Sequence, residues 1–282
     1  MRNLTLLLAV VTSVFAAETP APICSDPLPA PIRVLLVTGG CCHDYAAQHV
    51  IIEKGLLERV NVKVTHAYSP SKGTDVTFDI FNQPNWGKDF DVVVHDECAA
   101  DVKDKAYIEK ILAAHRGGLP AVNLHCAMHS YRFGNYGQPV KAGADNAAWF
   151  EFLGLQSSGH GPQLPIEITY VDTTSPASVG LPNWTTGNEE LYNNVAVLTG
   201  HVLAKGKQVQ KGKDGKPDKV TEAVVVWTNT YGPKNTRIFS TTLAHNNATV
   251  QDPRYLDLVT RGVLWTTGRL GPDGKAAPGY GR

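Results

Sequence analysis

IRVLLVTGG, residues 32–40, is a short apolar run rich in β-branched side chains that ends in two glycines. Such a run predicts a strand buried on both faces, as in a parallel sheet. Residues 46–60 follow with apolar side chains mainly at helical spacing, and residues 61–66 alternate like a strand. Together these segments predict a β-α-β unit.

The same alternation continues along the first half of the chain. Residues 91–95 and 120–124 predict further strands, residues 103–115 the helix between them, and residues 255–265 a closing helix. The second half has few other helices between its strand-like segments, which are 166–171, 195–203, 223–228 and 236–242. We therefore expect an α/β fold with a mostly parallel central sheet flanked by helices, and additional antiparallel strands in the second half.

The ends of the chain predict export and one folded domain. Residues 1–17 have the pattern of a signal peptide, with a short apolar run before small residues. Residues 18–31 form a proline-rich leader, residues 32–270 the domain, and residues 271–282 a flexible tail. We expect a periplasmic or extracellular protein without membrane insertion, because the apolar run is shorter than the roughly 18 residues that a membrane helix needs.

The content of charged residues, cysteines and histidines limits the binding partners and the chemistry that we expect. Lys and Arg total 26, as do Asp and Glu, so no basic field attracts nucleic acid. Five cysteines is an odd number, and the adjacent Cys41 and Cys42 are awkward partners for each other, so we expect no disulfide framework. Ten histidines are unusual, because imidazole suits metal binding and proton transfer. The oligomeric state is left open.

Histidines beside acids or thiols follow three expected strands. They stand in GGCCHDY at residues 39–45, HDEC at 95–98 and HCAMH at 125–129. The carboxyl ends of parallel strands share one edge of the sheet, where ligands bind in open α/β folds. The second half adds further candidates: His160, Glu189, Glu190 and His245.

This ordered set of segments resembles the ThuA-like (trehalose-utilisation) family over residues 33–270. The resemblance rests on the His43 loop, LHCA at 124–127, WFE at 149–151 leading to His160, NEELY from residue 188 and LAH at 243–245. It implies a flavodoxin-like fold similar to the class I glutamine amidotransferases, and a carbohydrate or oxidised-sugar substrate. The chain departs from the usual family pattern at Asn188 and Ala244.

The residues that an amidotransferase needs for its cysteine nucleophile can be looked for in this sequence. Those enzymes place a cysteine on a strained strand-to-helix elbow and activate it with a histidine held by an acid. Here the elbow position holds His125, Cys126 comes one residue late, and Asn247 replaces the acid that should follow His245. We therefore expect no amidotransferase activity. Cys126 fits a small buried thiol best, and a cysteine-dependent hydrolase using Cys126 is an alternative function.

The remaining candidates suit a metal or acid–base catalysis. His43, His160 and His245 are the expected metal ligands, and zinc with an open coordination position is the divalent ion that they suit best. His125 and Glu189 are the expected catalytic residues, one of them acting as base. A metal-free acid–base pocket is an equal alternative. No nucleotide cofactor is expected.

Side chains near these loops are the expected substrate contacts. Aromatic rings stack on sugar faces, and polar groups bind hydroxyls. For Trp149 considered alone, packing in the core is the favoured interpretation. The candidate substrate-binding residues are Tyr45, Glu97, His129, Trp149 and Tyr192.

We therefore expect an exported enzyme that acts on a carbohydrate or keto-sugar derivative as a hydrolase, lyase or isomerase. An oxidised sugar carries an acidified carbon-bound hydrogen beside its carbonyl, and one base plus an electrophile suffices to remove it. A noncatalytic sugar-binding protein with the same pocket is the alternative from another class.

Overall fold

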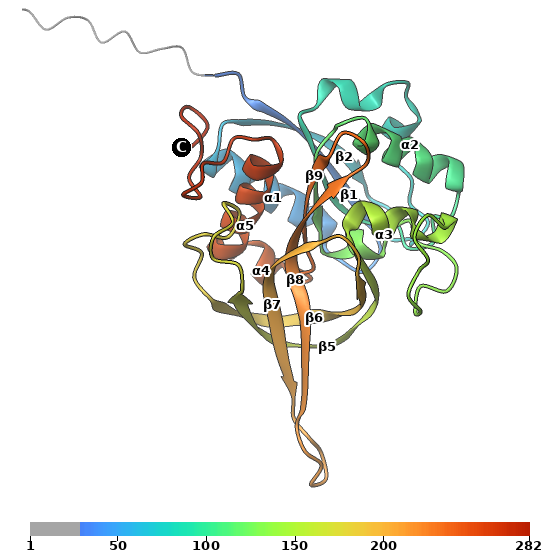
Figure 1. Cartoon of the computed structure of the whole chain (residues 1–282), viewed down its shortest axis with the longest axis vertical. Helices are drawn as coiled ribbons and strands as arrows, with labels where there is room; N and C mark the ends of the chain where they lie inside the picture. Colours follow the sequence, from blue (N-terminus) through green and yellow to red (C-terminus); the bar gives the residue numbers. More distant parts are fainter. Residues whose placement is uncertain (1–28) are drawn as a thin grey trace, which may run out of the picture.

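The computed structural model describes residues 29–282; the expected signal peptide and most of the leader lie outside the described residues. In this part of the chain nine strands form one sheet in the order β2-β1-β3-β4-β9-β8-β7-β5-β6 (Figure 1). The strands are β1 (Ile32–Gly40), β2 (Val62–Ser69), β3 (Val92–Cys98), β4 (Ala121–Leu124), β5 (Leu155–Tyr170), β6 (Trp184–Val197), β7 (His201–Gln210), β8 (Lys219–Tyr231) and β9 (Thr236–Thr241). The α-helices are α1 (Tyr45–Arg59), α2 (Lys105–Arg116), α3 (Ala148–Leu153), α4 (Asn247–Val250) and α5 (Pro253–Thr266). The 3-10 helices are η1 (Asp79–Asn82), η2 (Trp86–Asp89), η3 (His125–His129) and η4 (Asp145–Ala147).

The first half of the chain, together with β9, forms the parallel part of the sheet. β1 pairs in parallel with β2 on one side and β3 on the other. β3 pairs with β4, and β4 with β9, also in parallel. β3 is buried along its whole length and β1 almost so, which explains why both are apolar runs without alternation. The predicted β-α-β unit is therefore confirmed.

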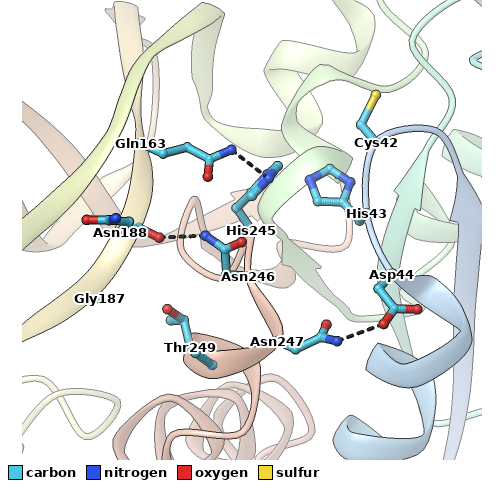
Figure 2. Close-up of a pocket in the computed structure, with 11 residues that line it drawn as sticks. Cys42, His43, Asp44, Gln163, Gly187, Asn188, His245, Asn246, Asn247 and Thr249 are labelled. Carbon is cyan, nitrogen blue, oxygen red and sulfur yellow. Dashed lines mark hydrogen bonds between the residues drawn. The ribbon is translucent and has the colours of Figure 1, made fainter.

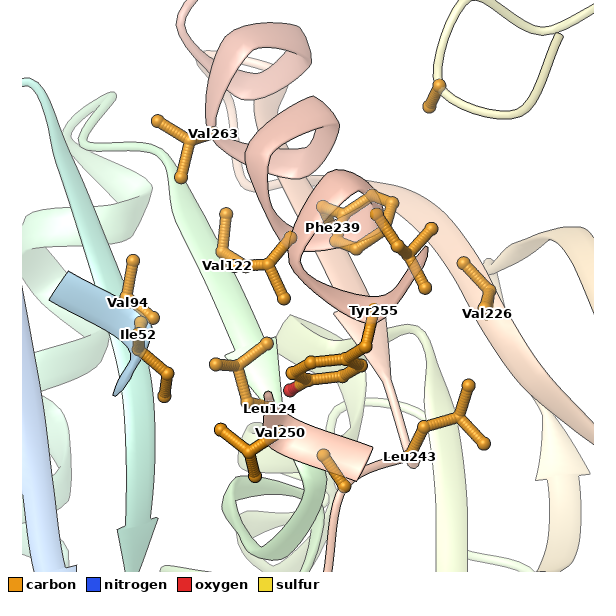
Figure 3. Packing of buried hydrophobic residues seen from close by; sticks show 14 of the residues in the cluster. Ile52, Val94, Val122, Leu124, Val226, Phe239, Leu243, Val250, Tyr255 and Val263 are labelled. Carbon is orange, nitrogen blue, oxygen red and sulfur yellow. The ribbon is translucent and has the colours of Figure 1, made fainter. Parts of the chain in front are cut away.

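Helices cover both faces of this parallel part. α1 and α5 pack on one face, where Ile52 and Tyr255 belong to the same apolar cluster as strand residues such as Val122 (Figure 3). α2 and α3 pack on the opposite face with Leu35 and Val37 of β1. Successive strand residues point to opposite faces, so a strand covered on both sides contributes to two apolar cores.

The second half also adds β5, β6, β7 and β8 to the same sheet, and all the pairings of these four strands are antiparallel. β5 has 16 residues and β6 has 14, against 4 in β4. The expectation of a mostly parallel sheet is therefore wrong, since the sheet is parallel only in its first part. Gly159, Gly161 and Pro162 interrupt the pattern of β5, and register shifts break its pairing with β6. These interruptions hide the strands in the sequence.

Residues 271–282 are packed rather than free, which departs from the expected flexible tail. Leu270 pairs with Ala276, and Gly281 pairs with Val60. Tyr280 packs against the core, and this apolar contact explains the order of a segment rich in Gly and Pro. No helix in residues 29–282 is long and apolar enough to cross a membrane.

Candidate functional site

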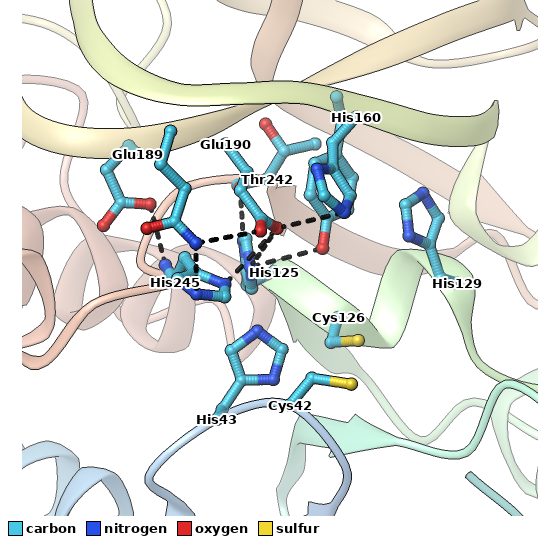
Figure 4. Close-up of polar contacts among 12 residues, drawn as sticks. Cys42, His43, His125, Cys126, His129, His160, Glu189, Glu190, Thr242 and His245 are labelled. Atoms are coloured by element: carbon cyan, nitrogen blue, oxygen red, sulfur yellow. Dashed lines mark hydrogen bonds and ion pairs between the residues drawn. The ribbon is translucent and has the colours of Figure 1, made fainter.

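Four side chains from separate segments meet at the carboxyl edge of the parallel strands (Figure 4). His43 follows β1, His125 follows β4, His245 follows β9, and Glu190 lies in β6. Each offers one nitrogen or oxygen atom, and these atoms all lie within 4.8 Å of one another. The structure thus brings together three of the histidines selected from the ends of the expected strands.

His125 occupies the sharp turn between β4 and η3. Its φ is 41°, in the left-handed region that is costly for a residue with a side chain. Its Nδ1–H donates to the carbonyl of Thr242 at 2.6 Å, which leaves Nε2 as the acceptor. The hydroxyl of Tyr192 lies 3.2 Å from that Nε2. The elbow therefore presents an imidazole nitrogen where an amidotransferase presents a thiol.

His43 is oriented in the same way by its own loop. Its Nδ1–H donates to the carbonyl of Cys41 at 3.1 Å. Its Nε2 is buried and has no hydrogen-bond partner among the described residues. Leaving such a group unpaired costs about 1–3 kcal/mol. Histidines that bind metals usually donate their other ring N–H to a carbonyl or carboxylate, so His43 and His125 both have the arrangement of metal ligands.

Glu190 provides the negative charge at the centre of the cluster. Its Oε2 lies 3.3 Å from His245 Nδ1, 3.6 Å from His125 Nε2 and 3.5 Å from His160 Nε2. Burial raises the pKa of Glu190, but its close interactions with His125 and His245 outweigh burial and hold that pKa well below its usual range. Glu190 is therefore an ionised carboxylate.

The histidines differ in their protonation. Burial, together with the neighbouring His125 and His245, lowers the pKa of His43 to about 2. The contact with Glu190 raises the pKa of His245 in spite of burial. His43 is thus a neutral imidazole at physiological pH, with its Nε2 lone pair available to a ligand.

Gln163 of β5 connects the cluster to the second half of the chain. Its amide donates to His245 Nε2 at 2.9 Å and to Glu190 Oε1 at 3.3 Å. The sequence did not single out Gln163. The available signal was its place three residues after His160, in the segment that already carried a candidate.

A cleft of about 560 Å³ opens beside His43 and His245 (Figure 2). Asn246 donates to the carbonyl of Asn188 across it at 2.5 Å, and Asn247 donates to Asp44 at 2.8 Å. Polar side chains dominate the lining, and few of them stand out in the sequence. The lining residues are Cys42, His43, Asp44, Gln163, Gly187, Asn188, His245, Asn246, Asn247, Ala248 and Thr249.

The family model described as trehalose utilisation, ThuA, matches residues 33–266. The chain belongs to the ThuA family. This confirms the resemblance inferred from the ordered motifs. Among curated proteins, none matches the chain.

Solved structures agree with the ThuA fold. A ThuA-like protein from Parabacteroides merdae is 19% identical with a TM-score of 0.62, covering 85% of this chain and 91% of that one. A ThuA-like protein from Bacteroides uniformis is 16% identical with a TM-score of 0.55, covering 89% and 99%. A cytoplasmic protein from Salmonella typhimurium is 10% identical with a TM-score of 0.52, covering 83% and 99%. At these identities the likeness concerns the fold alone.

Glu189, expected to be catalytic, does not face the histidines in this ThuA chain, whereas its neighbour Glu190 does. Glu189 is fully buried, and its carboxylate accepts the backbone N–H groups of His245 at 2.8 Å and Asn246 at 3.0 Å. Glu189 therefore fixes the loop that carries His245, and Glu190 is the carboxylate that faces the histidines. Adjacent strand residues point in opposite directions, and the sequence did not show which of the two faced the site.

His160, one of the expected metal ligands, lies at the rim of the cluster. Its side chain is 42% exposed, and its Nδ1–H donates to the carbonyl of Gly161 at 2.9 Å. Its Nε2 reaches Glu190, but His160 is not among the four groups whose donor atoms converge. Its place in the set of converging donors is taken by His125, which was expected to be catalytic.

The five expected substrate contacts are all buried, and none lines the cleft. Trp149 donates to the carbonyl of Ala127 within the apolar core on the α2 side. His129 stacks on Tyr192 with ring centroids 4.1 Å apart, and the hydroxyl of Tyr192 in turn contacts His125. The remaining two, Glu97 and Tyr45, contact His95 and the cysteine cluster respectively.

The cysteines contradict the expectation of no disulfides. Cys41 is bonded to Cys42, and Cys98 is bonded to Cys126. Adjacent Cα atoms lie closer than most disulfides require, which is why the first pair looked unsuitable. The Cys98–Cys126 bond joins the ends of β3 and β4, which the sequence did not place together. While this bond exists, Cys126 is unavailable as a nucleophile, and the cysteine-hydrolase alternative loses its attacking group.

Proposed function

We propose that this ThuA-family chain is an exported enzyme that acts on a carbohydrate or keto-sugar derivative, with a divalent metal, zinc in the first instance, held by His43, His125, His245 and Glu190. Three imidazole nitrogens and one carboxylate oxygen are donors that zinc prefers. The observation that carries the proposal is the buried Nε2 of His43, which has no hydrogen-bond partner in residues 29–282 and lies among the other three donors.

The polar cleft supports a carbohydrate as the substrate class. Amide and hydroxyl groups of residues such as Asn188, Asn247 and Thr249 line the cleft beside His43 and His245. Such groups both donate and accept hydrogen bonds, as the hydroxyls of a sugar require. Asn247 Oδ1 is buried without a partner among the described residues, and so is available to a hydroxyl donor. The family description, trehalose utilisation, agrees with this class.

His160 is the group that we assign to proton transfer. When bound, the metal would act as a Lewis acid that polarises a substrate carbonyl. The Nδ1–H of His160 is engaged by Gly161, so Nε2 is the free base, and the side chain is open to solvent at the rim of the cluster. Glu190 Oε2, 3.5 Å away, stabilises the imidazolium that forms when His160 accepts a proton.

Metal analysis and a substrate screen on the purified mature chain test the proposal. We expect one equivalent of zinc by elemental analysis, and its loss in His43→Ala and His245→Ala. His49→Ala is the matched control, because His49 is hydrogen-bonded to the carbonyl of Tyr45 and is not one of the converging metal donors. Turnover of 3-keto-glycosides and intact disaccharides should require the metal and fall in His160→Ala.

The alternatives predict different outcomes of the same experiment. Turnover that survives a chelator, with no stoichiometric metal, would favour a metal-free acid–base pocket in which His125 is the base. Binding of the sugar without turnover under any metal condition would favour a noncatalytic sugar-binding protein. A processed N-terminus near residue 17 by mass spectrometry of the exported protein tests the export part of the proposal.

A further inference from the structure

Four cysteine sulfurs form a contiguous cluster beside the histidines. The Cys41–Cys42 and Cys98–Cys126 disulfides lie next to each other, and Cys41 Sγ lies 3.5 Å from Cys98 Sγ. Contact between sulfurs of two different disulfides is the arrangement from which a thiolate released in one bond attacks the other. None of the four cysteines is needed by the proposed carbohydrate chemistry.

Solvent reaches this cluster at one end. Cys42 is exposed and lines the polar cleft, whereas Cys98 is 3% exposed and Cys126 is 7% exposed. Thiol–disulfide exchange requires the attacking thiolate to reach a sulfur atom, so an external thiol meets Cys42 first. Cys41, in contact with Cys98, connects this exposed end to the buried disulfide.

The loop that carries the adjacent pair is held against the buried pair. Gly40 has φ +103° and pairs with Cys98, and any side chain at Gly40 would collide with the Cys98 carbonyl. Cys42 has φ 79°, in the left-handed region that a cysteine rarely adopts. Such backbone persists only where its surroundings impose it, and the bond to Cys41 is one such constraint. Opening this bond therefore relieves the backbone of Cys42.

We propose that the four cysteines form a thiol–disulfide relay that oxidises an external dithiol, with Cys42 as the point of entry and Cys126 as the final thiol. A thiolate of the dithiol attacks Cys42 Sγ; a bond to Cys42 forms, the Cys41–Cys42 bond breaks, and the electron pair leaves on Cys41. The Cys41 thiolate then attacks Cys98 Sγ, the Cys41–Cys98 bond forms, and Cys126 leaves as a thiolate.

The second thiol of the dithiol completes the exchange. It attacks the sulfur of its own mixed disulfide, forms a disulfide within the oxidised dithiol and releases Cys42. The two protons of the dithiol end on Cys42 and Cys126. The dithiol has lost two electrons, and the cluster has gained them while retaining one disulfide, Cys41–Cys98. The new Cys126 thiol lies beside His43, because the donor atoms of His43, Cys98 and Cys126 are all within 4.8 Å of one another.

Limited reduction followed by mapping of free thiols tests the relay in the wild-type chain. The protein is treated with one equivalent of dithiothreitol, quenched with acid, alkylated and digested, and fragmentation of each peptide locates the alkylated cysteine, because Cys41 and Cys42 share one peptide. We expect alkylation of Cys42 and Cys126 and a disulfide-linked peptide joining Cys41 to Cys98. Alkylation of Cys41 and Cys42 with Cys98–Cys126 intact would overturn the relay, and so would no reduction at all.

Two single variants separate the order of the steps. In Cys42→Ser, Cys41 is a free thiol in contact with Cys98, so Cys126 should become alkylated without any reductant. In Cys41→Ser the contacting thiol is absent, and alkylation of Cys126 should be at least about tenfold lower than in Cys42→Ser. Equal alkylation in the two variants would remove Cys41 from the path. Circular dichroism is used to check that both variants fold. The thiol map of the wild-type chain tests the relay even if a variant does not fold.

This thiol readout is independent of the carbohydrate assay and of metal content. Failure of the relay leaves the proposed function untouched, and failure of the proposed function leaves the thiol map unchanged. The full mature chain is used throughout, and the separate peptide of Cys24, which lies outside the described residues, keeps its signal apart.

Discussion

The chain contains two clusters of histidine and glutamate that look alike in sequence but differ in structure. In the closed cluster, His95 Nδ1 lies 2.8 Å from Glu97 Oε1, and His95 Nε2 lies 3.1 Å from His115 Nε2. His115 Nδ1–H donates to the Leu119 carbonyl at 2.7 Å, so every ring nitrogen is paired. In the open cluster around Glu190, His43 Nε2 has no partner in the described part of the chain.

This difference shows that the number of histidines does not locate a binding site. Imidazole nitrogens without a hydrogen-bond partner do. The closed cluster is enclosed by the rings of Phe81, Trp149 and Phe152, and its hydrogen bonds end on the protein itself. Histidines whose ring nitrogens are all paired in this way hold a core together. The open cluster stands at a cleft, and its donor atoms converge without satisfying one another. Variants matched between the two clusters test this comparison.

The largest contrast is expected between the two glutamates. Glu190→Gln removes the anionic donor of the open cluster and should weaken zinc binding by more than about 100-fold, since even outer partners of metal ligands are worth 10–100-fold. Glu97→Gln should leave binding unchanged, because the amide can still hydrogen-bond to His95 Nδ1. Zinc titration by calorimetry measures both. Equal losses in the two variants would erase the distinction between the clusters.

Stability should show the reverse contrast. His115→Ala leaves His95 Nε2 and the Leu119 carbonyl unpaired in the core and opens a cavity, so the free energy of unfolding should fall by about 2 kcal/mol. His43→Ala, in the absence of metal, removes a nitrogen that is already unpaired; the relief of its desolvation offsets the lost packing, so the free energy of unfolding should change by less than about 1 kcal/mol. Urea denaturation in the presence of a chelator gives both values. A larger loss for His43→Ala would contradict the assignment.

Glu189 should have a smaller effect than Glu190 because it acts through His245. Glu189→Gln replaces one of the two oxygens that accept the backbone N–H groups of His245 and Asn246, and should weaken zinc binding by about tenfold. Zinc titration of Glu189→Gln against Glu190→Gln ranks them directly. If Glu189→Gln were the more damaging, Glu189 would be the ligand after all.

The smallest expected effect is a pH dependence from the closed cluster. Burial, followed by the charge of His95, lowers the pKa of His115 to about 3 in the folded chain. The unfolded chain binds a proton near pH 6.5 and the folded chain does not, so stability is complete above that pH and is lost as the pH falls toward 3. Between pH 6.5 and 5.5 the titration of His115 should lower the free energy of unfolding by about 1 kcal/mol. Urea denaturation at both pH values should show a loss about 1 kcal/mol smaller in His115→Phe than in wild type, because the other buried histidines contribute equally to both.

The parallel half could be predicted because its signals are local. The apolar runs of β1 and β3 and the helical spacing of α1 and α2 each lie within one short window of sequence. The carboxyl-end rule then selected His43, His125 and His245 without knowledge of their contacts. For these residues, knowing the topology was sufficient to anticipate that they lie close together.

The rest of the site depends on long-range register, which the sequence does not display. The bulged pairing of β5 with β6 decides that Glu190 faces the histidines and that Gln163 reaches His245. The pairing of Cys98 with Cys126 likewise depends on the spacing of two strand ends. The aromatic candidates were misplaced because a buried ring and a ring that binds a sugar have the same composition.

The cleft joins segments from opposite ends of the domain, since Asp44 and Asn247 are hydrogen-bonded although 203 positions separate them. His245 stands near the C-terminal helix, so a chain that emerges N-terminus first has no complete set of donors until almost all of it is available. A chain that crosses a membrane unfolded would therefore acquire its metal at its destination. The composition of that compartment, rather than the cytoplasmic metal pool, would then determine which ion fills the site.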